Sequence, residues 1–240
     1  MFQKICDSLL TLAYPQICHV CLESVEASAD GVVCRKCWQS ARIFSGNETL
    51  CAKCSAFVRE KPSNFQTFCH KCDEHFYDAA RAAGLYENAL AASILHLKQA
   101  PFVAGTLKNL FISAFENSPF QDATVIIPVP LSKRRHLERG FNQAEVLAEI
   151  LAKSFNLKID EQSLARKIHT PLHRAAMDRR ARELTVENAF EATRPKLIKG
   201  EKILLVDDVF TSGATTSYCA KALKKKGADK VYVLTLARAF

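Results

Sequence analysis

Four Cys-x-x-Cys pairs occur in the first 72 residues of this 240-residue chain. Two cysteines separated by two residues can present both sulfurs to one metal ion from a single tight turn. Twelve residues separate the first pair from the second, and fourteen separate the third from the fourth, which suits two ribbon-like sites with four cysteines each. The spacing therefore predicts two structural zinc ions, held by Cys18, Cys21, Cys34, Cys37, Cys51, Cys54, Cys69 and Cys72.

Other uses of these cysteines fit the pattern less well. A single pair could be a redox motif, but four pairs at near-regular spacing favour closed metal sites with a folding role. The pairing stays open, because the first pair could join the second or, in a cross-braced arrangement, the third. His19 and His70 lie inside the pairs and could replace a cysteine as ligand, whereas His75 is expected to be exposed. Cys6 and Cys219 stand outside the pattern and are expected to be packing residues.

The net charge of the chain changes near the point where the cysteine-rich region ends. Nine of the ten cysteines precede residue 73. Residues 1–78 contain eight Lys and Arg against nine Asp and Glu, whereas residues 79–240 contain 25 against 16. We therefore predict two domains: a cysteine-rich zinc-binding domain similar to a double zinc ribbon over residues 1–78, and a basic domain over residues 79–240.

The second region alternates helical patterns with short apolar strands. The clearest helix follows Asn142, a good N-cap residue, with Glu145 three positions later. Strands that alternate with helices favour an α/β domain with a mainly parallel sheet flanked by helices. The expected helices are 88–98, 104–115, 142–155 and 215–226, and the expected strands are 124–129, 202–206 and 231–237.

Two adjacent carboxylates, Asp207 and Asp208, end the apolar strand over 202–206 and precede a small hydroxyl-rich loop that opens a helix. The N–H groups at a helix start favour an anion, and Gly213 lets the backbone approach it closely. Carboxylates can accept hydrogen bonds from a sugar diol, so the stretch fits a ribose 5-phosphate. The absence of Gly-Lys-Ser/Thr excludes a Walker loop. A plain strand–turn–helix with an acidic surface pair is the alternative.

This stretch resembles the phosphoribosyl pyrophosphate (PRPP) motif of type I phosphoribosyltransferases. Joined to a cysteine-rich N-terminal domain, it resembles the ComF competence family, including GntX-type proteins. Ile127-Pro-Val-Pro130, Arg139-Gly-Phe-Asn-Gln143 and a middle block that begins at Arg166 support the resemblance. The chain departs from the middle block at His173 and Thr185, where the family has Gln and Asn.

The resemblance implies a PRPP site that works with magnesium. In the family, the acidic pair binds the ribose hydroxyls, the loop binds the 5-phosphate, and a basic loop faces the pyrophosphate. The PRPP-binding residues would be Asp207, Asp208, Val209, Phe210, Thr211, Ser212, Gly213, Ala214 and Thr215. The pyrophosphate or DNA candidates are Lys133, Arg134, Arg135 and Arg139, and Asp207, Asp208 and Arg139 would be the catalytic residues of a working enzyme. Lys98 has no role that the sequence indicates.

The basic residues allow a second interpretation. Residues 130–182 carry twelve Lys and Arg against six Asp and Glu. Within this segment, residues 174–182 are typical of contact with a nucleic-acid backbone, and equally of a solvated helix face. The candidates for DNA contact in its second half are Arg174, Arg179, Arg180 and Arg182.

These features lead to three functional hypotheses. The preferred one is a ComF-like protein of natural transformation that handles single-stranded DNA, binds PRPP, and works beside other DNA-uptake or competence proteins. The alternatives are an active phosphoribosyltransferase of nucleotide salvage or synthesis, and a regulator that senses PRPP. Residues 1–15 are typical of a short amphipathic helix, not of a secretory signal, and the apolar runs are too short to span a membrane. We therefore expect a cytoplasmic protein without membrane insertion.

Overall fold

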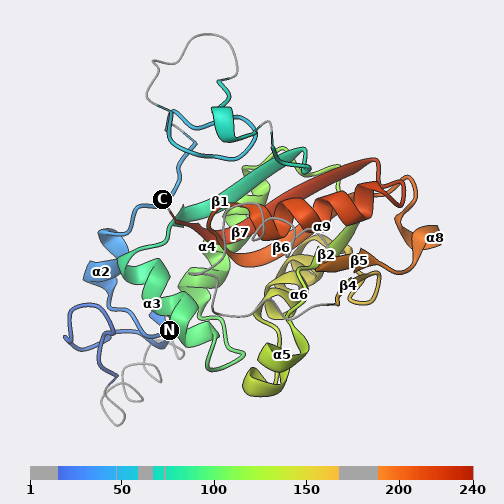
Figure 1. Cartoon of the computed structure of the whole chain (residues 1–240). Coiled ribbons are helices and arrows are strands. Elements are labelled where there is room, and N and C mark those ends of the chain that lie inside the picture. The colour runs from blue at the N-terminus through green and yellow to red at the C-terminus, as the bar shows by residue number, and fades with distance from the viewer. Residues whose placement is uncertain (1–15, 47, 59–66, 73, 168–188, 240) are drawn as a thin grey trace, which may run out of the picture.

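The computed structural model describes residues 16–46, 48–58, 67–72, 74–167 and 189–239 (Figure 1). Its centre is a five-stranded sheet with the order β1-β7-β6-β2-β3, in which all neighbouring strands are parallel. The predicted α/β class with a parallel sheet is therefore confirmed. The strands are β1 (Ala79–Leu85), β2 (Val125–Pro128), β3 (Lys158–Ile159), β6 (Lys202–Phe210) and β7 (Lys230–Arg238).

Helices cover both faces of the sheet (Figure 1). Alternate side chains of a strand point to opposite faces, so β6 sends Leu204 and Val206 to one face and Ile203 and Leu205 to the other. Burial on both faces explains why the central strands are continuous apolar runs. The first face packs against α3 (Asn88–Leu97), α4 (Gly105–Glu116) and α6 (Gln143–Phe155), and the second packs against α9 (Ala214–Lys224).

Shorter elements complete the described part of the chain. The antiparallel pair β4 (Leu164–Arg166) and β5 (Phe190–Ala192) packs beside α9. None of the helices in the described ranges is long and apolar enough to cross a bilayer. The short helices are α2 (Arg35–Gln39), α5 (Lys133–Arg139) and α8 (Pro195–Ile198), with 3-10 turns at Ser28–Asp30 and His70–Cys72.

Strand β6 is longer than the sequence predicts. The expected strand ends at residue 206, but β6 continues to Phe210 and pairs Asp207 with Thr235 of β7. The acidic pair therefore lies inside the strand, near its carboxyl end, instead of following it. Pairing with β7 holds this end, because a neighbouring strand fixes backbone that the apolar pattern alone does not mark.

Strand β1 has no counterpart among the expected elements. Its sequence, Ala-Ala-Arg-Ala-Ala-Gly-Leu, is poor in the β-branched and aromatic residues that are typical of strands. The small side chains allow close packing: a Cβ on Gly84 would lie 2.5 Å from the carbonyl oxygen of Arg42 and 2.7 Å from the Leu90 side chain. Tertiary packing, rather than strand propensity, therefore selects these residues.

The cysteine-rich region lies along the outer edge of β1. The N–H of Phe44 donates to the carbonyl of Ala83 (2.9 Å), and the N–H of Ala80 donates to the carbonyl of Lys53 (2.6 Å). These bonds use edge groups of β1 that would otherwise be open to pairing with another chain. Buried cysteines of the region also belong to the same two apolar clusters as the sheet.

Candidate functional site

Eight cysteines form two separate clusters of four. In each cluster the four sulfurs lie within 4.8 Å of one another. A tetrahedral zinc with Zn–S bonds of about 2.3 Å needs sulfurs roughly 3.8 Å apart. The Cys21–Cys34 and Cys54–Cys69 separations of 3.6 and 3.5 Å agree with this requirement. We call Cys18, Cys21, Cys34 and Cys37 the first cysteine cluster, and Cys51, Cys54, Cys69 and Cys72 the second.

This grouping answers the question of pairing. The first pair joins the second and the third joins the fourth, which is the sequential arrangement and not the cross-braced one. Backbone N–H groups favour thiolates in both clusters: those of Val20 and Cys34 donate to the sulfur of Cys18, and that of Cys69 donates to Cys51. Burial acts to raise the pKa of the Cys18 thiol, but the N–H donors outweigh it and lower that pKa to about 6. The two clusters are consistent with zinc.

The acidic pair lies at the carboxyl end of β6. The side chain of Asp208 is 15% exposed and pairs with the Nζ of Lys98, which follows α3, at 3.2 Å. Asp207 accepts the N–H of Asp208 (2.9 Å), and its charge acts on the buried thiol of Cys219 in α9. Asp208 therefore faces the end of α3, whereas Asp207 faces α9. As expected, Cys219 is a buried packing residue.

Burial and the neighbouring charge of Asp208 raise the pKa of Asp207 well above its usual value, whereas the positive charges of Lys98 and Arg166 act to lower it. Two adjacent carboxyl groups with cationic side chains nearby can accept hydrogen bonds from hydroxyl groups. They can also share a divalent ion. The sequence showed the acidic pair but gave Lys98 and Arg166 no role here, because both come from distant segments.

The hydroxyl-rich loop joins β6 to α9. Thr211 and Ser212 are exposed, and Gly213 has a φ of +77° immediately before the helix. A Cβ on Gly213 would lie 2.5 Å from the Phe210 ring and 3.2 Å from the His75 ring. A glycine is therefore required both by the backbone and by packing. The N–H of Ala214, the first of α9, donates to the hydroxyl of Ser212 (3.4 Å), so hydroxyl and N–H groups gather at the start of the helix, where N–H groups favour an anion.

His75 is not exposed, and the expectation from the sequence was wrong. Its ring is half-buried and stacks on the buried ring of Tyr77, with centroids 5.0 Å apart. Tyr77 in turn contacts the ring of Phe210 edge-to-face at 5.9 Å. The segment after the second cysteine cluster therefore packs directly under the hydroxyl-rich loop, a long-range contact that no local pattern marks.

The basic candidates after β2 lie on a helix and not in a loop. The hydroxyl of Ser132 accepts the N–H of Arg135 (3.4 Å) and begins α5, and Gly140, with a φ of +76°, ends it. Arg134 pairs with Glu138 at 2.7 Å. Lys133, Arg134 and Arg135 are exposed, and the Nη1 of Arg139 donates to the buried Gln143 (2.7 Å). Because β2 and β6 are parallel neighbours, α5 starts from the same sheet edge as the acidic pair.

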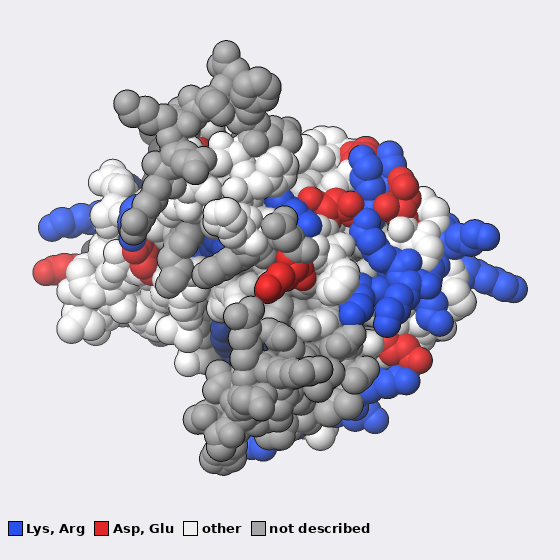
Figure 2. Space-filling view, turned by 45° about the horizontal axis from the view of Figure 1, so that its top comes forward, with Lys and Arg blue, Asp and Glu red and all other residues white. Residues whose placement is uncertain are grey.

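Some sequence predictions lie outside the described residues. These are the residues 1–15 with Cys6, and the segment 168–188 with His173, Arg174, Arg179, Arg180, Arg182 and Thr185. Within the described part, positive charge gathers elsewhere: Figure 2 shows Lys and Arg side chains clustered on the right of the view, where the C-terminal half of α9 lies. Lys221, Lys224, Lys225 and Lys226 contribute to this side, which the sequence did not single out.

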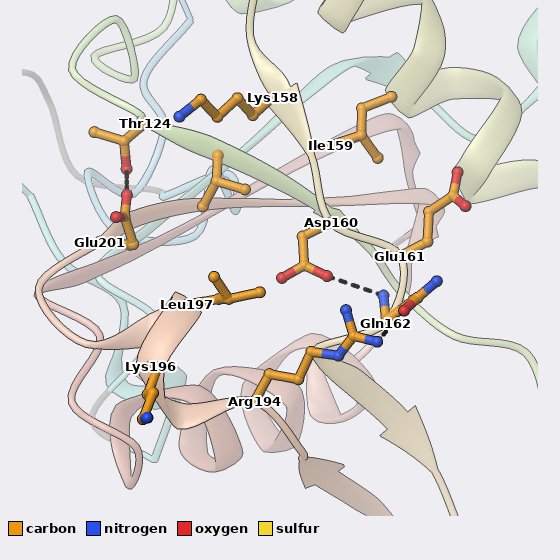
Figure 3. Close-up of a pocket in the computed structure, with 11 residues that line it drawn as sticks. Thr124, Lys158, Ile159, Asp160, Glu161, Gln162, Arg194, Lys196, Leu197 and Glu201 are labelled. Atoms are coloured by element: carbon orange, nitrogen blue, oxygen red, sulfur yellow. Dashed lines mark hydrogen bonds between the residues drawn. The ribbon is translucent and has the colours of Figure 1, made fainter.

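A pocket lies at the opposite edge of the sheet (Figure 3). It is lined by Thr124 and Glu201, which precede β2 and β6, and by Asp160 and Arg194. The Asp160 carboxylate accepts the N–H groups of Gln162 (3.0 Å) and Ser163 (2.9 Å) and so has a local turn role. Ligands of open α/β sheets bind at the carboxyl ends of the strands, so the acidic pair is the better candidate site.

Two family models match the chain. A double zinc ribbon domain matches residues 9–76, and a phosphoribosyl transferase domain matches residues 142–239. The first model covers both cysteine clusters, and the second covers the acidic pair and the hydroxyl-rich loop. The predicted architecture, a zinc-ribbon-like region followed by a phosphoribosyltransferase-like sheet, is confirmed.

Relatives with similar sequences extend over nearly the whole chain. Competence protein F of Haemophilus influenzae is 30% identical over 210 residues, covering 79% of this chain and 90% of that protein. DNA utilization protein YhgH of Escherichia coli O6:H1 is 29% identical over 240 residues, covering 98% and 95%. Competence protein ComFC of Bacillus subtilis is 27% identical over 226 residues, covering 84% and 89%.

Proposed function

The chain belongs to the ComF family of competence proteins, and from this premise we propose that it takes part in the uptake or utilisation of DNA and binds PRPP with magnesium at the acidic pair. Two of the relatives described above are named competence proteins and one is named a DNA utilization protein. Their names support the pathway. The phosphoribosyl transferase match supports the ligand.

The observation that carries the proposal is the acidic pair together with the loop that follows it. Asp207 and Asp208 would accept the two ribose hydroxyls, and the first N–H groups of α9 with Thr211 and Ser212 would hold the 5-phosphate. Lys98, 3.2 Å from Asp208, adds positive charge beside the acidic pair, where a polyphosphate would lie. Arg139 on α5 would face the pyrophosphate, because Arg suits bidentate phosphate contact.

Magnesium would reach the site with PRPP, because carboxylate oxygens are the ligands that it prefers. The side chain of Asp208 is 15% exposed, and an ion bound to it would displace the Nζ of Lys98, 3.2 Å away, toward the pyrophosphate. The bound ion would neutralise charge on the pyrophosphate. In this proposal the residues of the chain hold the ribose and orient both phosphate ends, whether or not the pyrophosphate is later released.

Isothermal titration calorimetry with magnesium-PRPP tests the proposal. We expect the double variant Asp207→Asn/Asp208→Asn to lose at least about tenfold in affinity, because the ribose hydroxyls lose both carboxyl acceptors and the site loses its negative charge. Asp160→Asn is the matched control, since Asn can keep the turn at the far edge of the sheet. An unchanged affinity in the double variant would refute the proposal. Release of pyrophosphate only when a nucleobase acceptor is added to the same samples would reveal an active phosphoribosyltransferase.

A further inference from the structure

Helix α9 has two different faces. Its inward face carries Cys219, Ala220 and Leu223, which are fully buried against the sheet. Its outward face carries Tyr218, Lys221, Ala222 and Lys225, whose spacing of three, four and seven residues aligns them on one side of a helix. The outward face therefore offers an aromatic ring and two cations in one row, separated by a small residue.

A shallow groove of about 280 Å³ runs beside this face, between α9 and the antiparallel pair β4–β5. Its lining includes Lys167, Lys221, Lys225 and Lys226 against one acidic side chain, Glu191. Lys167 and Glu191 form an ion pair of 2.7 Å with both side chains about half exposed. Such exposed pairs contribute little to stability, so Lys167 can exchange its partner for a ligand phosphate. The groove belongs to the positive side visible in Figure 2.

An aromatic ring from outside the helix, that of Phe76, lies beside two residues of the groove, Tyr218 and Lys221. The N–H of Phe76, which follows the second cysteine cluster, donates to the hydroxyl of Ser217 in α9 (3.1 Å). This bond holds the Phe76 ring 6.3 Å from the ring of Tyr218, at an angle of 42°. The Nζ of Lys221 lies 4.7 Å from the Phe76 ring and 5.9 Å from the Tyr218 ring. Phe76 is nevertheless 40% exposed, so part of its side chain is open to solvent beside Lys221.

Adjacent aromatic rings and cations are what single-stranded nucleic acid requires, because its unpaired bases stack on rings while its phosphates need positive charge. We propose that Phe76 and the outward face of α9 form a binding surface for single-stranded DNA. Phe76 and Tyr218 stack with bases, and Lys221, Lys225 and Lys226 contact phosphates. The inference rests on the proposed function, since it supplies the DNA contact of a protein that handles DNA, but its residues are separate from the PRPP-binding residues.

The surface has a fixed relation to the PRPP site. Gly213 and the hydroxyl-rich loop lie at the start of α9, and Lys225 lies directly after its end. The groove also differs from the basic segment 130–182 considered from the sequence, because Lys221, Lys225 and Lys226 come from the C-terminal part of the chain. A strand bound along α9 would therefore lie on the same helix whose N-terminus faces the phosphate of PRPP.

Fluorescence anisotropy with a labelled oligothymidylate and the zinc-loaded full chain tests this surface. We expect Lys221→Gln/Lys225→Gln to weaken binding about tenfold or more and to reduce the slope of log affinity against log salt by about 1.4, because two phosphate contacts on a single strand are lost. The matched control is Lys108→Gln/Lys153→Gln, which removes the same charge from exposed positions of α4 and α6 on the opposite face. The control should change affinity less than about twofold.

Loss of an aromatic ring should change affinity without changing its salt dependence. Tyr218→Ala should weaken binding about fivefold or more with an unchanged salt slope, because stacking is lost but no phosphate contact is. Tyr218→Phe keeps the ring and should bind like the wild type. Duplex DNA of the same length should be insensitive to Tyr218→Ala, because its bases are already stacked.

Three outcomes would overturn the surface: equal losses for the α9 pair and its control, wild-type binding by Tyr218→Ala, or no affinity of the wild type for oligothymidylate. Titration of the same α9 variants with magnesium-PRPP distinguishes failure of the DNA-binding surface from failure of the proposed PRPP site. Lys221→Gln/Lys225→Gln should bind PRPP normally. If DNA binding is insensitive to the α9 variants while the acidic-pair variant loses PRPP, the surface fails and the PRPP site stands.

Discussion

The first cysteine cluster packs against the face of the sheet that carries α3 and α4, whereas the second packs toward the face that carries α9. Near the first cluster, the indole N–H of Trp38 donates to the carbonyl of Asp30 (3.0 Å), and the Asp30 carboxylate accepts the hydroxyl of Thr106 in α4 (2.6 Å). These contacts join the first cluster to α4, on the face of the sheet that also carries α3 and α6.

Around the second cluster the contacts lead to the candidate PRPP site. The guanidinium of Arg238 donates to the carbonyl of Cys54 and lies 4.5 Å from the ring of Phe210. That ring packs under Gly213 of the hydroxyl-rich loop, and His75 reaches the same glycine. Two clusters with the same motif therefore differ in what they support. The first stabilises the packing of α4, whereas the second supports the hydroxyl-rich loop.

The largest expected effect comes from removing each cluster in turn. Cys51→Ser/Cys54→Ser should leave about one zinc per chain and cost on the order of 5 kcal/mol or more, because metal binding is coupled to folding. Its remaining folded fraction should bind PRPP weakly, because the ring of Phe210 loses its support. Metal analysis, urea unfolding and calorimetry with magnesium-PRPP measure these changes.

Cys18→Ser/Cys21→Ser is the matched variant of the first cluster. It should also lose one zinc and stability, but its folded fraction should keep wild-type affinity for PRPP. Limited proteolysis gives the folded fraction of each variant before titration. Equal losses of PRPP affinity in the two variants would contradict the difference between the clusters.

The next effect tests the packing of the loop itself. Gly213→Ala places a Cβ 2.5 Å from Phe210 in a left-handed backbone, whereas Gly140→Ala has a similar φ with no atom within 4 Å of the new Cβ. The backbone alone costs Ala about 1–2 kcal/mol, and the clash adds roughly 1–3 kcal/mol. Urea unfolding should therefore show Gly213→Ala to be the less stable variant, and calorimetry should show that it alone weakens PRPP binding. Equal stabilities would argue against tight packing under the loop.

These comparisons also show what the sequence could and could not predict. The cysteine pairs and the acidic pair with its loop are contiguous in sequence, so their chemistry was visible before the fold. Lys98, His75 and Phe76 reach the site or the groove through tertiary contacts, and no local pattern marks such contacts. Strand β1 was missed for a related reason: its alanines and Gly84 are selected by close packing and not by strand propensity.

A smaller effect is expected from the pH dependence of the acidic pair. Because the pKa of Asp207 is raised in the folded protein, its carboxyl holds a proton that the unfolded chain releases near pH 4. Stability should therefore fall as pH rises from about 4 through the raised pKa, by on the order of 1–3 kcal/mol. Asp207→Asn should flatten this decline in urea unfolding, and the control Asp160→Asn should retain it. A decline of wild-type size in Asp207→Asn would contradict the assignment to Asp207.

The smallest effect is expected from removing one aromatic polar group beside each cluster. The buried hydroxyl of Tyr77, beside the second cluster, has no hydrogen-bond partner among the described residues, whereas the indole N–H of Trp38 donates to Asp30. Tyr77→Phe should therefore leave stability unchanged or raise it by up to about 1 kcal/mol, because it removes a buried group without a partner. Trp38→Phe should lower stability by about 1–3 kcal/mol, since the Asp30 carbonyl loses its donor and the core loses volume. Both variants keep the ring contacts of Phe210, so neither should alter PRPP affinity in calorimetry. A destabilised Tyr77→Phe would show that its hydroxyl has a partner and that the second cluster is more strongly tied to the loop than its described contacts indicate.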